Sequence, residues 1–240
     1  MSFSMKLGNH AAKMLPVLLF AGLWNLFLPE AACADAHESK IKFHWAFVAL
    51  VGNGGNRVLE PIEGDTFLRS GDQFKMMVKL ESHCYVYVIY RNAQDGVKLL
   101  FPYTLDQFEH NSLKHERHYI PTGDAWFERG RYVGRESFYL VASPVRLVKL
   151  EEFFVAYESA DAVERSEIIR EISLEIQNLK KQSREDSALK PWGRKPLLLD
   201  VPSVEREREP FNQKPDIATL SRQFVISDRA FVKRYNIHHQ

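Results

Sequence analysis

The sequence predicts a mostly β protein of the α+β class, an antiparallel sandwich-like or open-barrel assembly with one or two C-terminal helices. Short β-type segments between Gly, Asn, Asp and Pro turns fill the chain up to about residue 147, as in sandwiches and barrels. From about residue 150 the apolar period becomes helical. The chain has 240 residues, of which 45% are hydrophobic and 12% aromatic, enough for a sizeable core.

The N-terminus is predicted to be a cleaved signal peptide over residues 1–34. Lys6 and Lys13 precede an apolar run from Met14 to Leu28, and small residues follow it. This run of 15 residues is shorter than the roughly 20 that span a bilayer, so we favour cleavage. An uncleaved membrane anchor is the first alternative. A lipidated N-terminus at Cys33 is the second alternative. We therefore expect a periplasmic or secreted protein that meets the membrane only through these segments.

Charge and cysteine content exclude several classes of protein. The formal net charge of +1 provides no basic surface for nucleic acid. Two cysteines exclude a disulfide scaffold or a cysteine-rich zinc module, and only Cys84 remains after signal cleavage. We expect that lone thiol to be buried and unreactive, because His83 beside it in a strand would point to the opposite face.

The first predicted strands show period-2 patterns. Residues 43–51 have apolar odd positions, and 57–62 form a return strand whose Pro61 indicates a sheet edge. In residues 74–80 the even positions are apolar, which predicts one buried face and one mostly wet face.

Residues 83–90 are apolar on both faces, which predicts a central strand covered by helices or by a second sheet. Strands are also expected at 97–101 and 137–142, and residues 103–119 are expected to form a long polar loop.

Two helices are predicted after the β-rich part, at 150–157 and 161–182. Asp161 and Glu164 form a capping-box pattern at the start of the second helix. Its narrow apolar stripe packs either on the sheet, which we favour, or on a partner helix. The chain is predicted to consist of a signal peptide (1–34), a β-rich domain (35–147), packed helices (148–182), a Pro- and charge-rich linker or lid (183–216) and a C-terminal strand segment (217–240).

Several short motifs occur in a fixed order along the β-rich part. They are Ser70-Gly71-Asp72, Tyr85-Val86-Tyr87, Leu100-Phe101-Pro102, Ile120-Pro121 and Gly134-Arg135-Glu136. In this order and spacing they resemble the bacterial domain-of-unknown-function family 4384, over roughly residues 60–145. The resemblance implies a mostly β accessory domain that is often exported, with no established catalytic residues. We expect no cofactor. Gly71 and Gly96 are expected in turns that need positive φ, with Asp72 bonded to its own turn.

The candidate binding residues are aromatic and basic side chains in or beside loops. Such residues either plug the open end of a sandwich or form a surface that recognises a peptide, glycan or protein. They are Trp126, Phe127, Arg129, Arg131, Tyr132, Tyr103 and Tyr119.

His110, His115 and His118 are weak candidates for a metal site, because H-x4-H-x2-H is not an established ligand spacing.

The sequence therefore predicts an exported, non-catalytic accessory domain of the bacterial envelope. We expect it to bind an unidentified protein or peptide partner through the loop aromatics or through strand addition at a sheet edge. The alternative is a periplasmic domain that either binds or hydrolyses a small ligand or glycan. No nucleic acid partner is expected.

Overall fold

The computed structural model describes residues 41–52, 57–94, 96–109, 113–128, 134–186, 215–226 and 229–239. Within them the chain forms two open, mostly antiparallel sheets and two α-helices, which confirms the predicted α+β, mostly strand class. The predicted signal peptide, Cys33 and residues 187–214 of the predicted linker lie outside the described residues.

Sheet A contains six strands. It has the order β10-β1-β4-β7, and β2 pairs with β1 while β8 pairs with β4. The strands are β1 (Ile41–Val51), β2 (Val58–Pro61), β4 (Gln73–Leu80), β7 (Arg117–Ile120), β8 (Phe127–Glu128) and β10 (Arg222–Ile226).

Sheet B contains five strands in the order β3-β11-β9-β5-β6, and β3 runs parallel to β11. The strands are β3 (Asp65–Leu68), β5 (Tyr85–Arg91), β6 (Val97–Phe101), β9 (Arg135–Ser143) and β11 (Phe231–His239). The predicted C-terminal strand pair is thus split between the sheets, because β10 joins sheet A and β11 joins sheet B.

The main core lies between the two sheets. Successive side chains of a strand point to opposite faces, so the apolar odd positions of β1 and even positions of β4 both face sheet B. There they meet inward side chains of β5, β9 and β11. The aromatic centre of this core consists of Phe43, Trp45, Phe47, Phe74, Phe138 and Tyr235.

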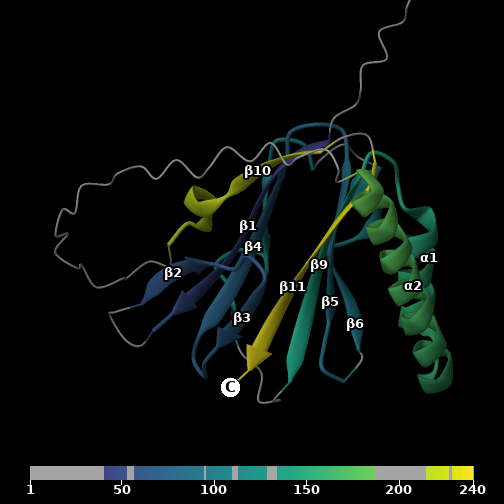
Figure 1. Ribbon diagram of the computed structural model, residues 1–240, viewed down its shortest axis with the longest axis horizontal. Helices are drawn as coiled ribbons and strands as arrows, with labels where there is room; N and C mark the ends of the chain where they lie inside the picture. The colour runs from purple at the N-terminus through teal and green to yellow at the C-terminus, as the bar shows by residue number, and fades with distance from the viewer. Residues whose placement is uncertain are drawn as a thin grey trace, which may run out of the picture. The chain divides into compact units, whose positions relative to one another are not determined.

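Strand β5 is covered on both faces, as its two-sided apolar pattern predicts. Val86 and Val88 face sheet A, whereas Tyr87 and Ile89 face two helices, α1 (Val148–Ser159) and α2 (Ala162–Asp186). Figure 1 shows both helices, in green, on the side of sheet B that faces away from sheet A. The second sheet and the helices are therefore both present as covers.

The apolar stripe of α2 packs on sheet B, as we favoured. Ile172, Ile176 and Leu179 are buried in the cluster that contains Tyr87 and Ile89. At the start of α2, Asp161 Oδ1 accepts hydrogen bonds from the N–H groups of Val163 and Glu164 at 2.8 and 3.0 Å, which confirms the predicted cap. In the described part of the chain, no helix is long and apolar enough to cross a membrane.

The prediction of a mostly wet face on β4 is wrong. Gln73, Lys75 and Met77 are all buried, because a third apolar cluster covers the outer face of sheet A. A 3-10 helix, η3 (Ile217–Leu220), contributes Ile217 to this cluster, and Trp126 closes it. A short segment from the far end of the chain thus hides side chains that local alternation marks as exposed.

Two further expectations are corrected. Residues 103–119 are not one long loop, because they contain the 3-10 helix η2 (Leu105–Phe108) and most of β7. Gly71 has the expected positive φ of 91° and Asp72 Oδ2 accepts a hydrogen bond from the Arg69 N–H at 2.7 Å, but Gly96 lies outside the positive-φ region. Its neighbour Asn92 is so close that a Cβ on Gly96 would lie 2.7 Å from the amide nitrogen.

A buried polar network fixes the helices to sheet B. The Tyr87 hydroxyl donates to Glu151 Oε1 at 2.7 Å and accepts from the Leu147 N–H at 2.9 Å. The Arg146 guanidinium donates to Glu151 Oε2 at 2.7 Å and to the Leu105 carbonyl at 3.3 Å. The Glu151 carboxylate in α1 is thereby connected through Tyr87 to the central strand and through Arg146 to η2.

We predict that Tyr87→Phe lowers the free energy of unfolding by about 1–3 kcal/mol, because it leaves Glu151 and the Leu147 N–H without their buried partner. Tyr85→Phe is the matched control, since Tyr85 lies on the same face of β5 and makes no described hydroxyl hydrogen bond. Urea denaturation measures both. Equal losses for the two variants would contradict the structural role of the network.

Candidate functional site

The structure brings two of the predicted binding aromatics together. Trp126 and Tyr119 lie on the outer face of sheet A around the ammonium group of Lys75. The Lys75 Nζ is 5.2 Å from the centre of the Tyr119 ring and 5.8 Å from that of Trp126. Lys75 is only 5% exposed and Trp126 only 8% exposed. We call Lys75, Tyr119 and Trp126 together the Lys75 cage.

Backbone carbonyls complete the Lys75 cage. The Lys75 Nζ donates hydrogen bonds to the carbonyls of Gly123 and of Ala125, the latter at 3.0 Å. A buried ammonium is stable only if such acceptors replace its water shell, and the two aromatic faces add cation–π attraction. The cage therefore fixes the 121–126 segment onto β4.

The C-terminal part of the chain contacts the same face through Asp216. Its carboxylate accepts from the Tyr119 hydroxyl at 2.8 Å, pairs with Arg117 at 3.2 Å and caps η3 through the Ala218 N–H at 2.9 Å. The Ala218 N–H, followed by Tyr119 and Arg117, holds the pKa of Asp216 below its usual range. The Tyr119 hydroxyl is thus hydrogen-bonded to the residue that caps η3.

Of the other predicted binding residues, the structure describes Phe127 and Tyr103, and neither encloses the Lys75 ammonium. Phe127 faces the main core, with its ring centre 5.2 Å from that of Phe74. Tyr103 is 37% exposed, and its hydroxyl donates to the Tyr119 carbonyl at 2.7 Å. The remaining three, Arg129, Arg131 and Tyr132, lie outside the described residues.

The candidate histidines do not converge where the structure describes them. His118 is buried against Phe101, and its Nε2 lies 3.2 Å from the Leu113 carbonyl. His115 is exposed and lies 3.8 Å from the carboxylate of Glu81. His110 lies outside the described residues, within which no group of three or more His, Cys, Asp or Glu side chains has a metal-binding arrangement.

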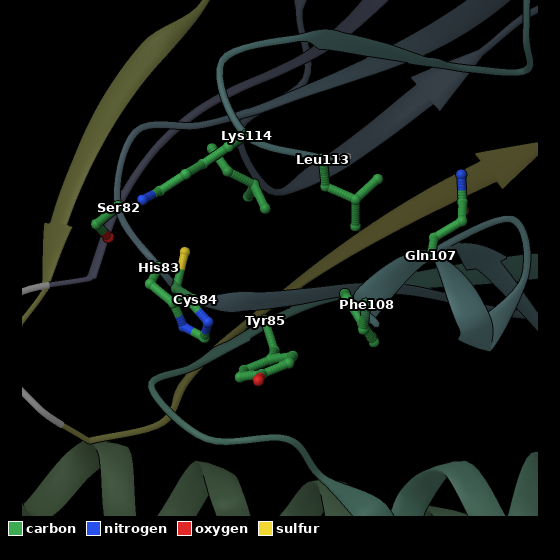
Figure 2. A pocket seen from close by; sticks show the side chains of 9 residues that line it. Ser82, His83, Cys84, Tyr85, Gln107, Phe108, Leu113 and Lys114 are labelled. Carbon is green, nitrogen blue, oxygen red and sulfur yellow. The ribbon is translucent and has the colours of Figure 1, made fainter. Parts of the chain in front are cut away.

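A small pocket surrounds Cys84 (Figure 2). Figure 2 shows the sulfur directed away from the His83 ring, as the strand geometry predicts. The pocket has a volume of about 30 Å³, which is about the volume that one molecule occupies in liquid water. Burial raises the pKa of the Cys84 thiol to about 11, and the hydrogen bond to Ser82 and the charge of Lys114 only partly oppose this. At neutral pH the group is a protonated thiol and not a nucleophile.

The sequence reasoning did not identify the outer edge of β10 as a distinct surface. The Lys42 carbonyl accepts from the N–H groups of Glu81 and Ser82 at 2.9 and 3.1 Å, and the Lys42 N–H donates to Ser82 Oγ at 2.8 Å. Both backbone groups of Lys42 therefore point toward β4. Lys42 lies opposite Val225 in the register of β1 and β10.

Opposed residues in an antiparallel pair alternate between hydrogen-bonded and non-hydrogen-bonded positions. Since Lys42 points toward β4, Val225 and also Gln223 direct their N–H and C=O groups away from β1. Among the described residues, none pairs with this side of β10. We call this row the β10 edge.

We predict that Lys75→Met lowers the free energy of unfolding by about 1–3 kcal/mol, because the carbonyls of Gly123 and Ala125 lose their buried donor. Lys79→Met is the matched control on the same strand, where Lys79 pairs with Glu81 at 2.6 Å near the surface. Chemical denaturation compares the two. A loss for Lys75→Met no larger than the control loss would show that the cage does not stabilise the fold.

We predict that the folded protein resists alkylation of Cys84 until the pH approaches 11, whereas the unfolded chain reacts from its ordinary pKa near 9. The raised pKa stabilises the folded state fully below pH 9, and this contribution is lost as the pH rises through about 11. Iodoacetamide labelling followed by mass spectrometry measures the rate at each pH. Rapid labelling of the folded state at pH 8 would contradict the buried placement.

The comparisons with known proteins agree with the predicted family. Residues 68–146 match the family described as "Domain of unknown function (DUF4384)". No curated protein and no solved structure matches the chain. The matched residues run from the end of β3 to the segment before α1 and include the Lys75 cage and Cys84, whereas β1, β10 and β11 lie outside them. Residues 68–146 of this chain are therefore a DUF4384 domain.

Proposed function

We propose that this chain is an exported, non-catalytic accessory domain of the bacterial envelope that binds an extended segment of a partner protein as an added strand at the β10 edge. The observation that carries the proposal is the outward direction of the Gln223 and Val225 backbone groups. An incoming strand can hydrogen-bond to both residues, as in β-augmentation. The exposed Val225 side chain, 53% accessible, adds apolar contact.

Comparison with the other described edges supports the choice of β10. Natural proteins protect edge strands with proline, lysine, bulges or short length. Strand β2 ends at Pro61, while β6 carries the exposed Lys98, pairs through an irregular register and is followed by Pro102. Strands β3 and β7 have four residues each. Strand β10 has five residues and contains neither proline nor lysine.

The state of the reactive side chains supports binding rather than catalysis. Cys84 is protonated, Lys75 is enclosed, and the buried Glu151 is paired with Arg146. Each of these groups is therefore buried or bonded within the described part of the fold. Export is part of the proposal because of the signal-peptide pattern in residues 1–34.

The loop-aromatic alternative has weaker support. Trp126 and Tyr119 are bound within the Lys75 cage and to Asp216, so docking on them requires existing contacts to open. Loss of partner capture in Trp126→Ala would also follow from loss of the cage alone. The β10 edge offers a cleaner test, because its outward groups have no such structural role.

We predict that Val225→Pro and Val225→Lys reduce partner capture from envelope extract by about tenfold or more. Proline removes one outward N–H, and lysine places a charge in the edge. The measurement is affinity capture with natively exported, C-terminally tagged protein, quantified by mass spectrometry. The same preparation gives the mature N-terminus, which we expect near Ala34 or Ala36.

Val155→Lys is the matched control, since Val155 is 58% exposed on α1. A partner kept by Val155→Lys and lost by both β10 variants at unchanged melting temperature supports strand addition. Equal recovery with all variants would overturn the β10 edge as the binding surface.

A further inference from the structure

A second cavity lies between α2 and the outer face of sheet B. It has a volume of about 100 Å³. Its floor is a cross-strand row formed by Ile89, Tyr139 and Arg234 on β5, β9 and β11. Its opposite wall comes from α2, where Ile172 and Ile176 are almost fully buried. Isoleucine side chains therefore line the cavity from both sides.

All the charged side chains that line this cavity are positive. Its lining includes Arg91 from β5, Arg234 from β11 and Lys180 from α2, but no Asp or Glu. Arg91 and Lys180 also interact with other groups. Arg234 is exposed, and no carboxylate within the described residues lies within ion-pair distance of it. Three separate elements thus direct positive charge at an apolar cavity, a combination that complements an anion with an aliphatic group.

The size of the cavity limits the ligand. A volume of 100 Å³ is smaller than the roughly 150 Å³ that accommodates benzene in an engineered protein cavity. It admits one branched side chain but not a long acyl chain. The rest of the ligand must lie on the exposed rim, where Gln177 offers an amide beside the charged groups.

We propose that this cavity binds the C-terminal residue of a peptide, with a leucine- or valine-type side chain inside and the α-carboxylate at Arg234. The guanidinium can hold a carboxylate through two parallel hydrogen bonds. The site lies on sheet B and α2 and is independent of strand addition at the β10 edge on sheet A.

The test is titration of the full mature chain with N-acetyl-L-leucine, followed by NMR of the isoleucine methyl groups. We expect saturable shifts at Ile89, Ile172 and Ile176. N-acetyl-L-leucinamide has the same side chain without the carboxylate and should bind at least about tenfold more weakly. Equal binding of acid and amide, or no saturable shift with either, would overturn the proposal.

Two variants of the same type locate the carboxylate. Arg234→Gln should raise the dissociation constant of N-acetyl-L-leucine about tenfold or more. Arg170→Gln is the matched control on α2, since Arg170 is exposed and pairs with Glu167 at 2.6 Å outside the cavity. Equal weakening by both would overturn the assignment of Arg234. Binding of 3-methylbutanoate without binding of N-acetyl-L-leucine would overturn the peptide source.

Discussion

The structure depends on the burial of both faces of each sheet. Strand β5 carries apolar side chains in both directions, and β1 does the same through most of its length. The two sheets cover each other on one side only, so each needs a second cover. The helices supply it for sheet B, and Trp126 with the 215–220 segment supplies it for sheet A.

The DUF4384 match covers only part of the residues that form this core. The matched range provides β4, β7 and β8 of sheet A and β5, β6 and β9 of sheet B. The aromatic core between the sheets is completed by β1 and β11 from outside that range. The flanking segments are therefore structural parts of the same core, and β10 enters the fold with them at the edge of sheet A.

The two covers also determine which polar side chains are bonded within the fold. Lys75, Glu151 and Tyr87 have chemistry that an enzyme could use, but each is bonded where a cover meets its sheet. Burial raises the pKa of Tyr87 in the same way as that of Cys84, with desolvation as the largest cause. The two proposed binding sites lie at the margins of the covers, at the β10 edge and beneath α2.

Local sequence patterns predicted the elements whose partners lie on a repeating face. The two-sided strand at 83–90, the stripe of α2 and its Asp161 cap are all confirmed, because alternation and helical period are local properties. The burial of Lys75 was missed because Trp126 and Ile217, far away in the sequence, cover that face. The strand β7 was missed because it forms by pairing with the distant β4. The loop aromatics were identified as a group, but sequence alone could not separate Trp126 and Phe127, which face different clusters.

The most direct test of the account is residue-resolved amide hydrogen exchange along β10 in the free protein. We expect Gln223 and Val225 to exchange rapidly, while Phe224 and Ile226, which face β1, are protected. Such alternation would show an edge with free donors. Uniform protection along β10 would mean that this edge is already paired, and would contradict the central claim that it is open to a partner strand.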